Sequence, residues 1–242
     1  MYQASGDRHR YYLRGIGNEA DFSGLDANFR QAYGYGFSDI LGDAWADLLS
    51  DRRDGDNCVD IVGFSRGGIE ATEFANRVAD AFPDERIRFV GLYDPVGSVG
   101  QPGWFGGYRF TLPANVEHAA EAMALDEDRS MFPATNVRGA VQQWFRGTHS
   151  DVGGGWADHR LSDVALQWMA QQASSAGVSF DLGSVRPEIT NPPQPNAPIN
   201  KNSGFTSWFT TPGGRTVIRP LTVDDVNGYI EATAFGSAYF GL

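Results

Sequence analysis

The sequence predicts an α/β fold, with a mostly parallel sheet and helices on both of its faces. Two strand-like segments, Val59–Phe64 and Ile87–Tyr93, are separated by Arg66–Phe82, in which apolar residues recur at helical spacing. Two consecutive strands joined by one helix form a βαβ unit, and the strands of such a unit are parallel. The chain has 242 residues, enough for one ordinary domain with a sizeable core. We therefore expect residues 1–242 to form a single domain.

Further segments extend this unit in both directions along the chain. The additional elements expected are strands over Arg10–Arg14 and Val141–Phe145 and helices over Phe37–Leu49, Val116–Leu125 and Asp163–Ser174. For the last helix, Ser162 is the expected N-cap and Gly177 the end. From about residue 185 the prolines become frequent, which predicts an irregular C-terminal arm.

Composition excludes several classes of function. The 19 basic and 30 acidic residues give a formal charge of −11, which argues against nucleic-acid binding and against electrostatic attachment to a membrane. A single cysteine, Cys58, excludes a disulfide framework and a thiolate metal cluster. No apolar run has the length of a transmembrane helix, and the N-terminus has no apolar signal-peptide core. We expect synthesis in the cytoplasm without a signal peptide, and no metal or cofactor.

The clearest chemical motif is Gly63-Phe64-Ser65-Arg66-Gly67, a G-x-S-x-G between a predicted strand and a predicted helix. A serine on such a sharp turn adopts a strained backbone, and small residues on both sides let strand and helix approach. Gly63 and Gly67 are expected to supply this space. Ser65 is then the candidate nucleophile, and the backbone N–H of Arg66, at the positive end of the helix, is a candidate oxyanion donor.

A serine nucleophile needs a base and a group that orients the base. Among the four histidines, His149 follows a predicted parallel strand and so reaches the same edge of the sheet as Ser65. The alternatives are His9 before the first strand, His118 in the predicted helix and His159 in a polar turn.

Two residues compete for the role of the orienting acid. Asp94 ends the strand after the G-x-S-x-G helix, whereas Asp151 stands only two residues from His149 and would need an unusual turn to face it. We favour Asp94. The resulting chain order of Ser65, Asp94 and His149 is that of the α/β-hydrolases.

Three weaker features have two interpretations each. Gly15, at the end of the first predicted strand, is a candidate second oxyanion donor. The run Gly153-Gly154-Gly155 is either a phosphate-binding nest or, as we favour, a turn. The third feature is a set of aromatic residues that either line an acyl-chain groove or, more commonly, pin loops to the core, namely Trp104, Phe105, Tyr108, Phe110, Phe205, Trp208 and Phe209.

These motifs resemble the DUF2235 family, whose best-known members are the type VI secretion lipase effectors of the Tle1 group. The similarity extends from about Tyr11 to Gly177. The segments that carry it are Gly-Phe-Ser-Arg-Gly-Gly at 63–68, Gly-Leu-Tyr-Asp-Pro-Val-Gly-Ser-Val-Gly at 91–100, His-Ala-Ala-Glu-Ala-Met-Ala-Leu-Asp-Glu-Asp-Arg at 118–129, Trp-Phe-Arg-Gly-Thr-His-Ser-Asp-Val-Gly-Gly-Gly at 144–155 and Leu-Ser-Asp-Val-Ala-Leu-Gln-Trp-Met at 161–169.

The resemblance implies an α/β-hydrolase fold, a nucleophile at Ser65, an acid at Asp94, a base at His149 and phospholipase A-type ester hydrolysis. It implies a phospholipid substrate in a rival cell, export by a contact-dependent secretion system, and an immunity or secretion-apparatus protein as partner. Two features differ from the family pattern. The usual first strand with Phe-Asp-Gly-Thr is absent from this sequence, and so are the long membrane-binding insertions of the larger effectors.

The sequence thus predicts a serine ester hydrolase, most simply a phospholipase A-type lipase. Two alternatives remain open. A catalytically inactive α/β-hydrolase-fold module for protein interaction would exploit the sheet edge left unpaired by the absent first strand. An esterase or thioesterase for soluble acyl compounds would keep the chemistry and change the substrate.

Overall fold

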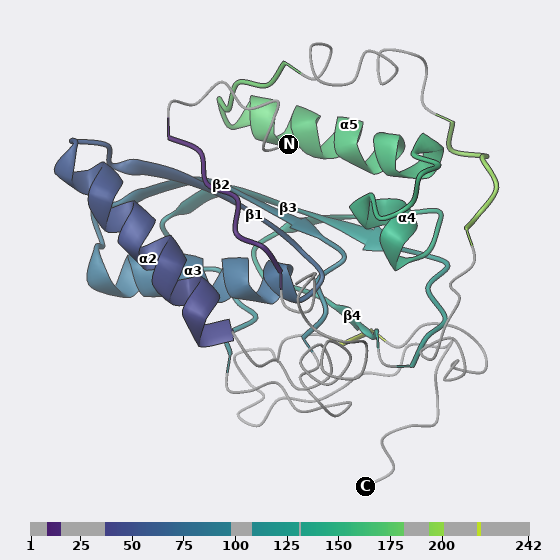
Figure 1. The fold of residues 1–242 in the computed structure, drawn as a ribbon, viewed down its shortest axis with the longest axis horizontal. Coiled ribbons are helices and arrows are strands. Elements are labelled where there is room, and N and C mark those ends of the chain that lie inside the picture. Colours follow the sequence, from purple (N-terminus) through teal and green to yellow (C-terminus); the bar gives the residue numbers. More distant parts are fainter. Residues whose placement is uncertain are drawn as a thin grey trace, which may run out of the picture.

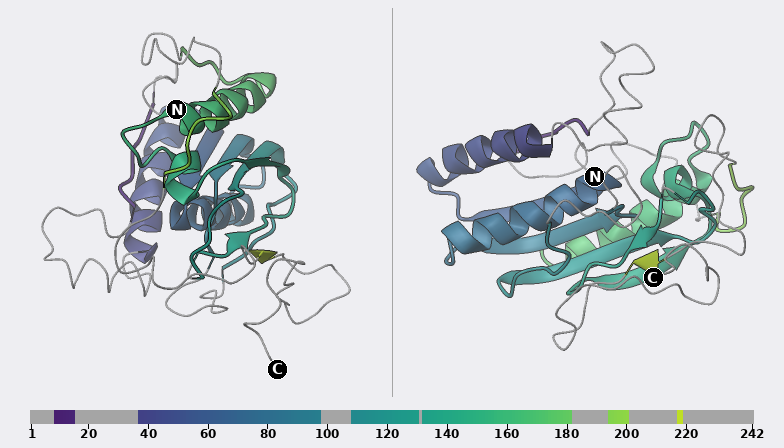
Figure 2. Two further views of the ribbon diagram at one scale, coloured as in Figure 1. Left: turned by 90° about the vertical axis from the view of Figure 1, so that its right-hand side faces the viewer. Right: turned by 90° about the horizontal axis from the view of Figure 1, so that it is seen from below.

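The computed structural model describes residues 9–15, 37–97, 108–130, 132–181, 194–200 and 217–218 (Figure 1). A parallel sheet lies between two layers of helices, as the three views show (Figures 1 and 2). Helices α2 (Phe37–Arg53) and α3 (Arg66–Ala81) cover one face. Helices α4 (His149–Gly153) and α5 (Arg160–Ser175) lie on the other. The prediction of an α/β fold with helices on both faces is confirmed.

The main sheet has four strands in the order β1-β2-β3-β5, and every neighbouring pair is parallel. Its strands are β1 (Cys58–Phe64), β2 (Arg86–Tyr93), β3 (Val116–Ala124) and β5 (Val141–Phe145). A second, two-stranded sheet pairs β4 (Ala134–Thr135) with β6 (Val217–Ile218). The register aligns Phe64 of β1 with Tyr93 of β2, so both strands end together at one edge.

Strand β2 is the centre of the core because both of its faces are covered. Val90 and Leu92 belong to the cluster formed with α3, whereas Phe89 and Tyr93 belong to the cluster formed with α5. This alternation is the two-residue period of a strand. A strand covered on both faces is apolar along nearly its whole length, and that is the signal by which the sequence predicted it.

The segment Val116–Leu125, predicted as a helix, is the strand β3 over Val116–Ala124. Its alanines favour a helix by local propensity, but a short apolar run does not distinguish a buried helix from a buried strand. Pairing with β2 on one side and β5 on the other decides the outcome, and Ala119–Ala124 are all buried. The small side chains leave room for α5, which packs on β3.

The prediction of a first strand is also wrong. Residues Arg10–Arg14 form no strand within the described segment 9–15. Instead, His9 and Tyr11 contact Asp51 of α2, with distances of 2.6 Å from His9 Nδ1 and 2.7 Å from Tyr11 Oη to Asp51 Oδ1. Among the described residues β1 is therefore an edge strand.

Helix α5 begins one turn earlier than predicted. Its N-cap is His159, and Ser162 lies inside the helix, where its hydroxyl donates to the His159 carbonyl at 3.0 Å. At the other end, Gly177 has φ +88°, the left-handed conformation that terminates helices at glycine. The predicted end of this helix is confirmed, and the predicted N-cap is wrong.

Met169 of α5 offers a test of the packing between α5 and the sheet. Its side chain is fully buried against Gly91 of β2. We expect Met169→Ala to lower the free energy of unfolding by about 2–5 kcal/mol, because it opens a cavity at this contact. Urea denaturation measures this, with Gln171→Ala at an exposed position of the same helix as the matched control. Equal losses in the two variants would contradict the described packing.

Candidate active site

The turn between β1 and α3 holds Ser65 in a strained conformation. Ser65 has φ 60° and ψ −128°, a region that residues other than glycine rarely occupy. Its amide donates to the Tyr93 carbonyl at 2.9 Å, and its carbonyl accepts from the amides of Gly68 and Val96 at 3.0 and 3.1 Å. These bonds tie the turn to the end of β2 and maintain the strain.

The space for this turn comes from Gly63 and Gly68. A Cβ on Gly63 would overlap the Gly67 carbonyl, which confirms the prediction for Gly63. A Cβ on Gly68 would lie 2.8 Å from Cβ of Pro95, whereas one on Gly67 would have its nearest neighbour, Glu70 Oε2, at 3.8 Å. The prediction that Gly67 supplies the space is wrong. On the helix side the close contact is between Gly68 and Pro95, and Pro95 lies in the loop after β2, outside the G-x-S-x-G motif.

Asp94 and His149 meet at the carboxyl end of the sheet. Asp94 follows β2 with φ 42°, and both side chains are buried. His149 Nδ1 lies 2.6 Å from Asp94 Oδ2, while Asp94 Oδ1 accepts from the Ala124 amide at 2.8 Å. A proton on Nδ1 shared with the carboxylate leaves Nε2 as the acceptor nitrogen of the ring.

The aromatic ring of Phe64 connects His149 to the strained turn. The two rings are stacked with centroids 4.5 Å apart, and Phe64 is the residue immediately before Ser65. Gly153 makes this contact possible, because a Cβ there would overlap the Phe64 ring. Residues from β1, the end of β2 and α4 are thereby gathered at one edge of the sheet.

Asp151 has a different role from Asp94. One of its oxygens, Oδ2, accepts from the Thr148 amide at 2.9 Å, closing the first turn of α4, and Oδ1 accepts from Asn200 Nδ2 at 2.6 Å. The carboxylate thus joins the start of α4 to the described segment 194–200. Of the two competing acids, Asp94 is the one that contacts the imidazole.

The glycine run after His149 is a turn. Gly154 has φ +88°, and the amides of Gly154 and Gly155 both donate to the Ser150 carbonyl, at 3.0 and 2.9 Å. Amides used in this way do not form an anion nest, which agrees with the interpretation we favoured.

The remaining candidates make other contacts or lie on other segments. His9 contacts Asp51, and His118 Nε2 lies 3.0 Å from Gln172 Oε1. His159 precedes α5. Gly15 is exposed, and the described segment 9–15 contains no strand. The assignment of Gly15 as a second oxyanion donor depended on that strand, so the structure gives it no support.

The candidate oxyanion and groove residues are only partly described. Arg66 is the first residue of α3, where backbone N–H groups have no partner within the helix. Tyr108 and Phe110 pack partly buried against the core, in agreement with a structural role. The other aromatic residues of the suggested groove, Trp104, Phe105, Phe205, Trp208 and Phe209, lie outside the described residues.

A buried carboxyl group one turn into α3 was not predicted. Glu70 is 6% exposed, and burial raises its pKa to about 7, although the charge of Arg66 acts in the opposite direction. The pKa of Arg66 is lowered by burial, and the charge of Glu70 only partly offsets this. No sequence signal marks Glu70, since a glutamate in a helix is ordinarily a surface residue.

The parallel sheet, its flanking helices and the strand–serine–helix turn are the arrangement predicted for an α/β-hydrolase-like fold. Residues 70–172 match the family model for the catalytic domain of Tle1-like phospholipase effectors of the type VI secretion system. This match confirms the predicted resemblance to the Tle1 group. The matched family is one of phospholipases. Among the helices that the structure describes, none combines the length and the apolar character of a membrane span.

Individual relatives are similar over short stretches. An uncharacterized protein of Saccharomyces cerevisiae is 42% identical over 50 residues, which span 19% of this chain and 7% of the yeast protein. A Tle1 effector solved bound to the VgrG spike is 27% identical, with TM-score 0.34 over 39% of this chain and 24% of that one. An uncharacterized protein from Pseudomonas aeruginosa is 23% identical, with TM-score 0.45 over 70% and 31% of the two chains.

The two adjacent glycines after Arg66 allow a direct test of the turn. We expect Gly68→Ala to lower the free energy of unfolding by about 1–3 kcal/mol, because the new methyl group is forced against Pro95. Gly67→Ala has room and lies in the helix, so it should be neutral or raise stability by up to about 1 kcal/mol. Thermal unfolding of both variants checks this, and the reverse ranking would disprove the assignment.

Proposed function

We propose that this chain is a serine ester hydrolase of the phospholipase A type that acts through Ser65, Asp94 and His149. The observation that carries the proposal is the buried contact between Asp94 and His149 beside the strained serine turn. The family match supports the reaction class, since the matched domain is a phospholipase catalytic domain. The substrate is then a phospholipid or a related acyl ester.

In the proposed reaction, Nε2 of His149 removes the hydroxyl proton of Ser65, and Oγ attacks the acyl carbonyl. Asp94 holds the Nδ1–H tautomer and stabilises the imidazolium. The oxyanion is stabilised by backbone N–H groups, including that of Arg66. Collapse of the tetrahedral intermediate breaks the ester bond, and His149 returns the proton to the departing alcohol. Water, activated by His149 in the same way, then releases the fatty acid from Ser65.

The proposal extends to the biological setting. Because the matched family consists of type VI secretion effectors, we propose that the protein is exported by that contact-dependent route. A component of the secretion apparatus and an immunity protein are the partners expected for such an effector. The two alternatives, an inactive interaction module and an esterase or thioesterase for soluble compounds, are outcomes of the following test.

Replacing the candidate nucleophile tests the reaction class. We expect Ser65→Ala to reduce hydrolysis of a p-nitrophenyl ester and of phospholipid vesicles by at least about 10³-fold, and to abolish labelling by a fluorophosphonate probe. Ser179→Ala, at an exposed position, is the control. Unlabelled wild-type protein would favour the interaction module. Activity on the soluble ester without activity on vesicles would favour the esterase.

Replacing each acid separately tests which one orients the base. We expect Asp94→Asn to lower kcat by about 10⁴-fold, because an amide stabilises the wrong imidazole tautomer. Asparagine tolerates the positive φ at this position, so the backbone is preserved. Asp151→Asn should instead lower stability by about 1 kcal/mol through the weakened start of α4, with a much smaller loss of kcat. A larger catalytic loss in Asp151→Asn would reverse the assignment.

A further inference from the structure

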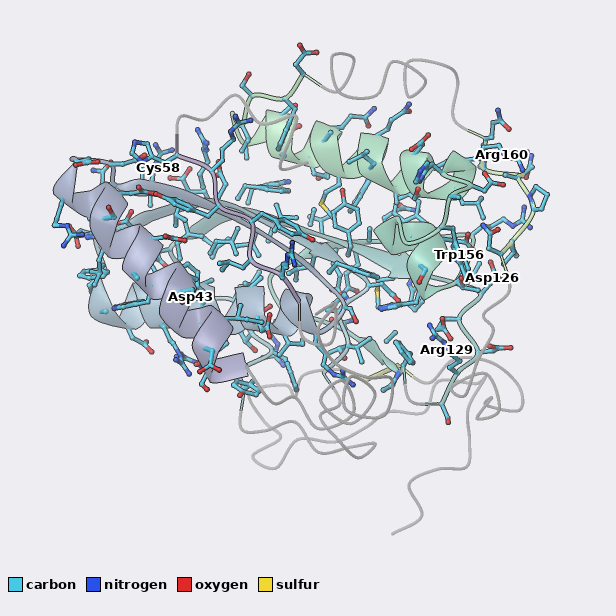
Figure 3. The ribbon with its side chains drawn as sticks, in the orientation of Figure 1. Asp43, Cys58, Asp126, Arg129, Trp156 and Arg160 are labelled. Carbon is cyan, nitrogen blue, oxygen red and sulfur yellow. The ribbon has the colours of Figure 1, made fainter. Side chains whose placement is uncertain are left out.

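A second buried carboxylate holds His149 from its backbone side. Glu127, on the segment after β3, is 1% exposed and accepts the His149 amide on Oε2 at 3.1 Å. The same carboxylate accepts three hydrogen bonds from Arg129, from its amide at 2.9 Å, from Nε at 2.7 Å and from Nη2 at 2.8 Å. Figure 3 shows Arg129 on the segment that passes beside α4.

Arg129 also reaches His149 by a second route, through an aromatic ring. Its guanidinium carbon lies 3.7 Å from the centre of the Phe132 ring, and Phe132 meets the His149 ring edge to face at 5.0 Å between centroids. Glu127, Arg129, Phe132 and His149 therefore form a closed circuit of contacts. One branch fixes the backbone where α4 begins, and the other fixes the imidazole.

The two charges of this circuit neutralise each other. Burial raises the pKa of Glu127, but the hydrogen bonds and charge of Arg129 outweigh it and hold the pKa below its usual value, so Glu127 is ionised. A buried ion pair is seldom a net source of stability, since desolvation offsets its attraction. We therefore expect the contribution of this pair to lie in the position of His149, which it contacts, and not in the free energy of unfolding.

We propose that Glu127 and Arg129 are positioning residues for His149. They fix both its backbone and its ring, and as a neutral pair they prevent a second net negative charge, besides that of Asp94, from acting on the imidazole. The proposal rests on the proposed role of His149 as the base. The proposed triad of Ser65, Asp94 and His149 does not include this pair.

The test compares Glu127→Gln, Arg129→Met and the double variant. Glu127→Gln keeps an acceptor for the His149 amide but leaves the positive charge of Arg129 uncompensated. Arg129→Met leaves the negative charge of Glu127 uncompensated. We expect the pH at which the His149 imidazole titrates, followed by NMR of histidine-labelled protein, to fall in the first and rise in the second by about half a unit or more. In the double variant it should return toward the wild-type value.

The other charged groups on the elements next to His149 are unchanged in this comparison. They are Asp94 after β2, Asp126 after β3, Asp151 on α4, and Arg160 and Asp163 in the first turn of α5, which packs on α4. Since the variants share all of them, the opposite shifts report the Glu127–Arg129 pair alone. In each single variant we also expect kcat for a soluble ester to fall about 10- to 100-fold with KM unchanged, and part of the loss to be recovered in the double variant.

The chain contains a matched control pair away from the site. Arg52 of α2 forms an ion pair with buried Glu85 and stacks over Phe82, with its guanidinium carbon 4.0 Å from the ring centre. Glu85→Gln, Arg52→Met and their double variant repeat the same chemistry between α2 and the turn before β2. Each single variant should lower the melting temperature, because it leaves one charge of a buried pair uncompensated. All three variants should leave the His149 titration and kcat unchanged.

The outcomes separate this proposal from the proposed function. Shifts of opposite sign that cancel in the double variant support it, and this holds whether or not the fluorophosphonate probe labels Ser65. No shift, or shifts of the same sign, would overturn it even if Ser65 is labelled. A wild-type protein that is not labelled, but shows the opposite shifts, would refute the hydrolase and retain the positioning of His149.

Discussion

The hydrogen bond from the Ser65 amide to the Tyr93 carbonyl holds the two halves of the candidate site together. It continues the β1–β2 ladder one residue beyond the last registered pair, Phe64 and Tyr93, and holds the serine turn against the strand end that carries Asp94. Ser65 and Asp94 both have positive φ angles, which a free chain of residues other than glycine avoids. The register of two parallel strands thus holds both residues in these strained conformations. Asp94 in turn contacts the imidazole of His149.

Around this edge, three buried carboxylates each accept hydrogen bonds from the segments beside them. Asp94 accepts from the Ala124 amide and contacts the imidazole, Glu127 is saturated by Arg129 and the His149 amide, and Asp151 binds Thr148 and Asn200. Each carboxylate therefore fixes a different part of the His149 segment. Because unsatisfied buried charges are costly, these contacts specify one arrangement of the loop. The net charge of −11 says nothing of this organisation, since it is a sum over the whole chain.

The predictions succeeded where local pattern and burial agree. Strands over Val59–Phe64 and Ile87–Tyr93 and the helix between them follow from apolar runs with different periods, and the serine turn follows from its place between them. They failed where pairing overrides propensity. The alanines of β3 favour a helix by propensity, but their backbone pairs with two neighbouring strands. Arg10–Arg14 has the residues of a strand, but Tyr11 contacts α2 instead. The Glu127–Arg129 circuit was missed because an acidic turn in sequence gives no sign that it will be buried.

Local patterns along the chain are enough to select Ser65, Asp94 and His149 as candidate reactive groups, because strand–turn–helix patterns are local and parallel strands carry their C-terminal residues to one edge. Which acid contacts the imidazole, which glycine leaves room for the turn and what surrounds His149 become visible only in the folded chain. Each of these depends on segments far apart in the chain, Pro95 beside Gly68, Asp94 beside His149 and Asn200 beside Asp151. Such contacts arise from packing and register, which no local pattern of residues encodes.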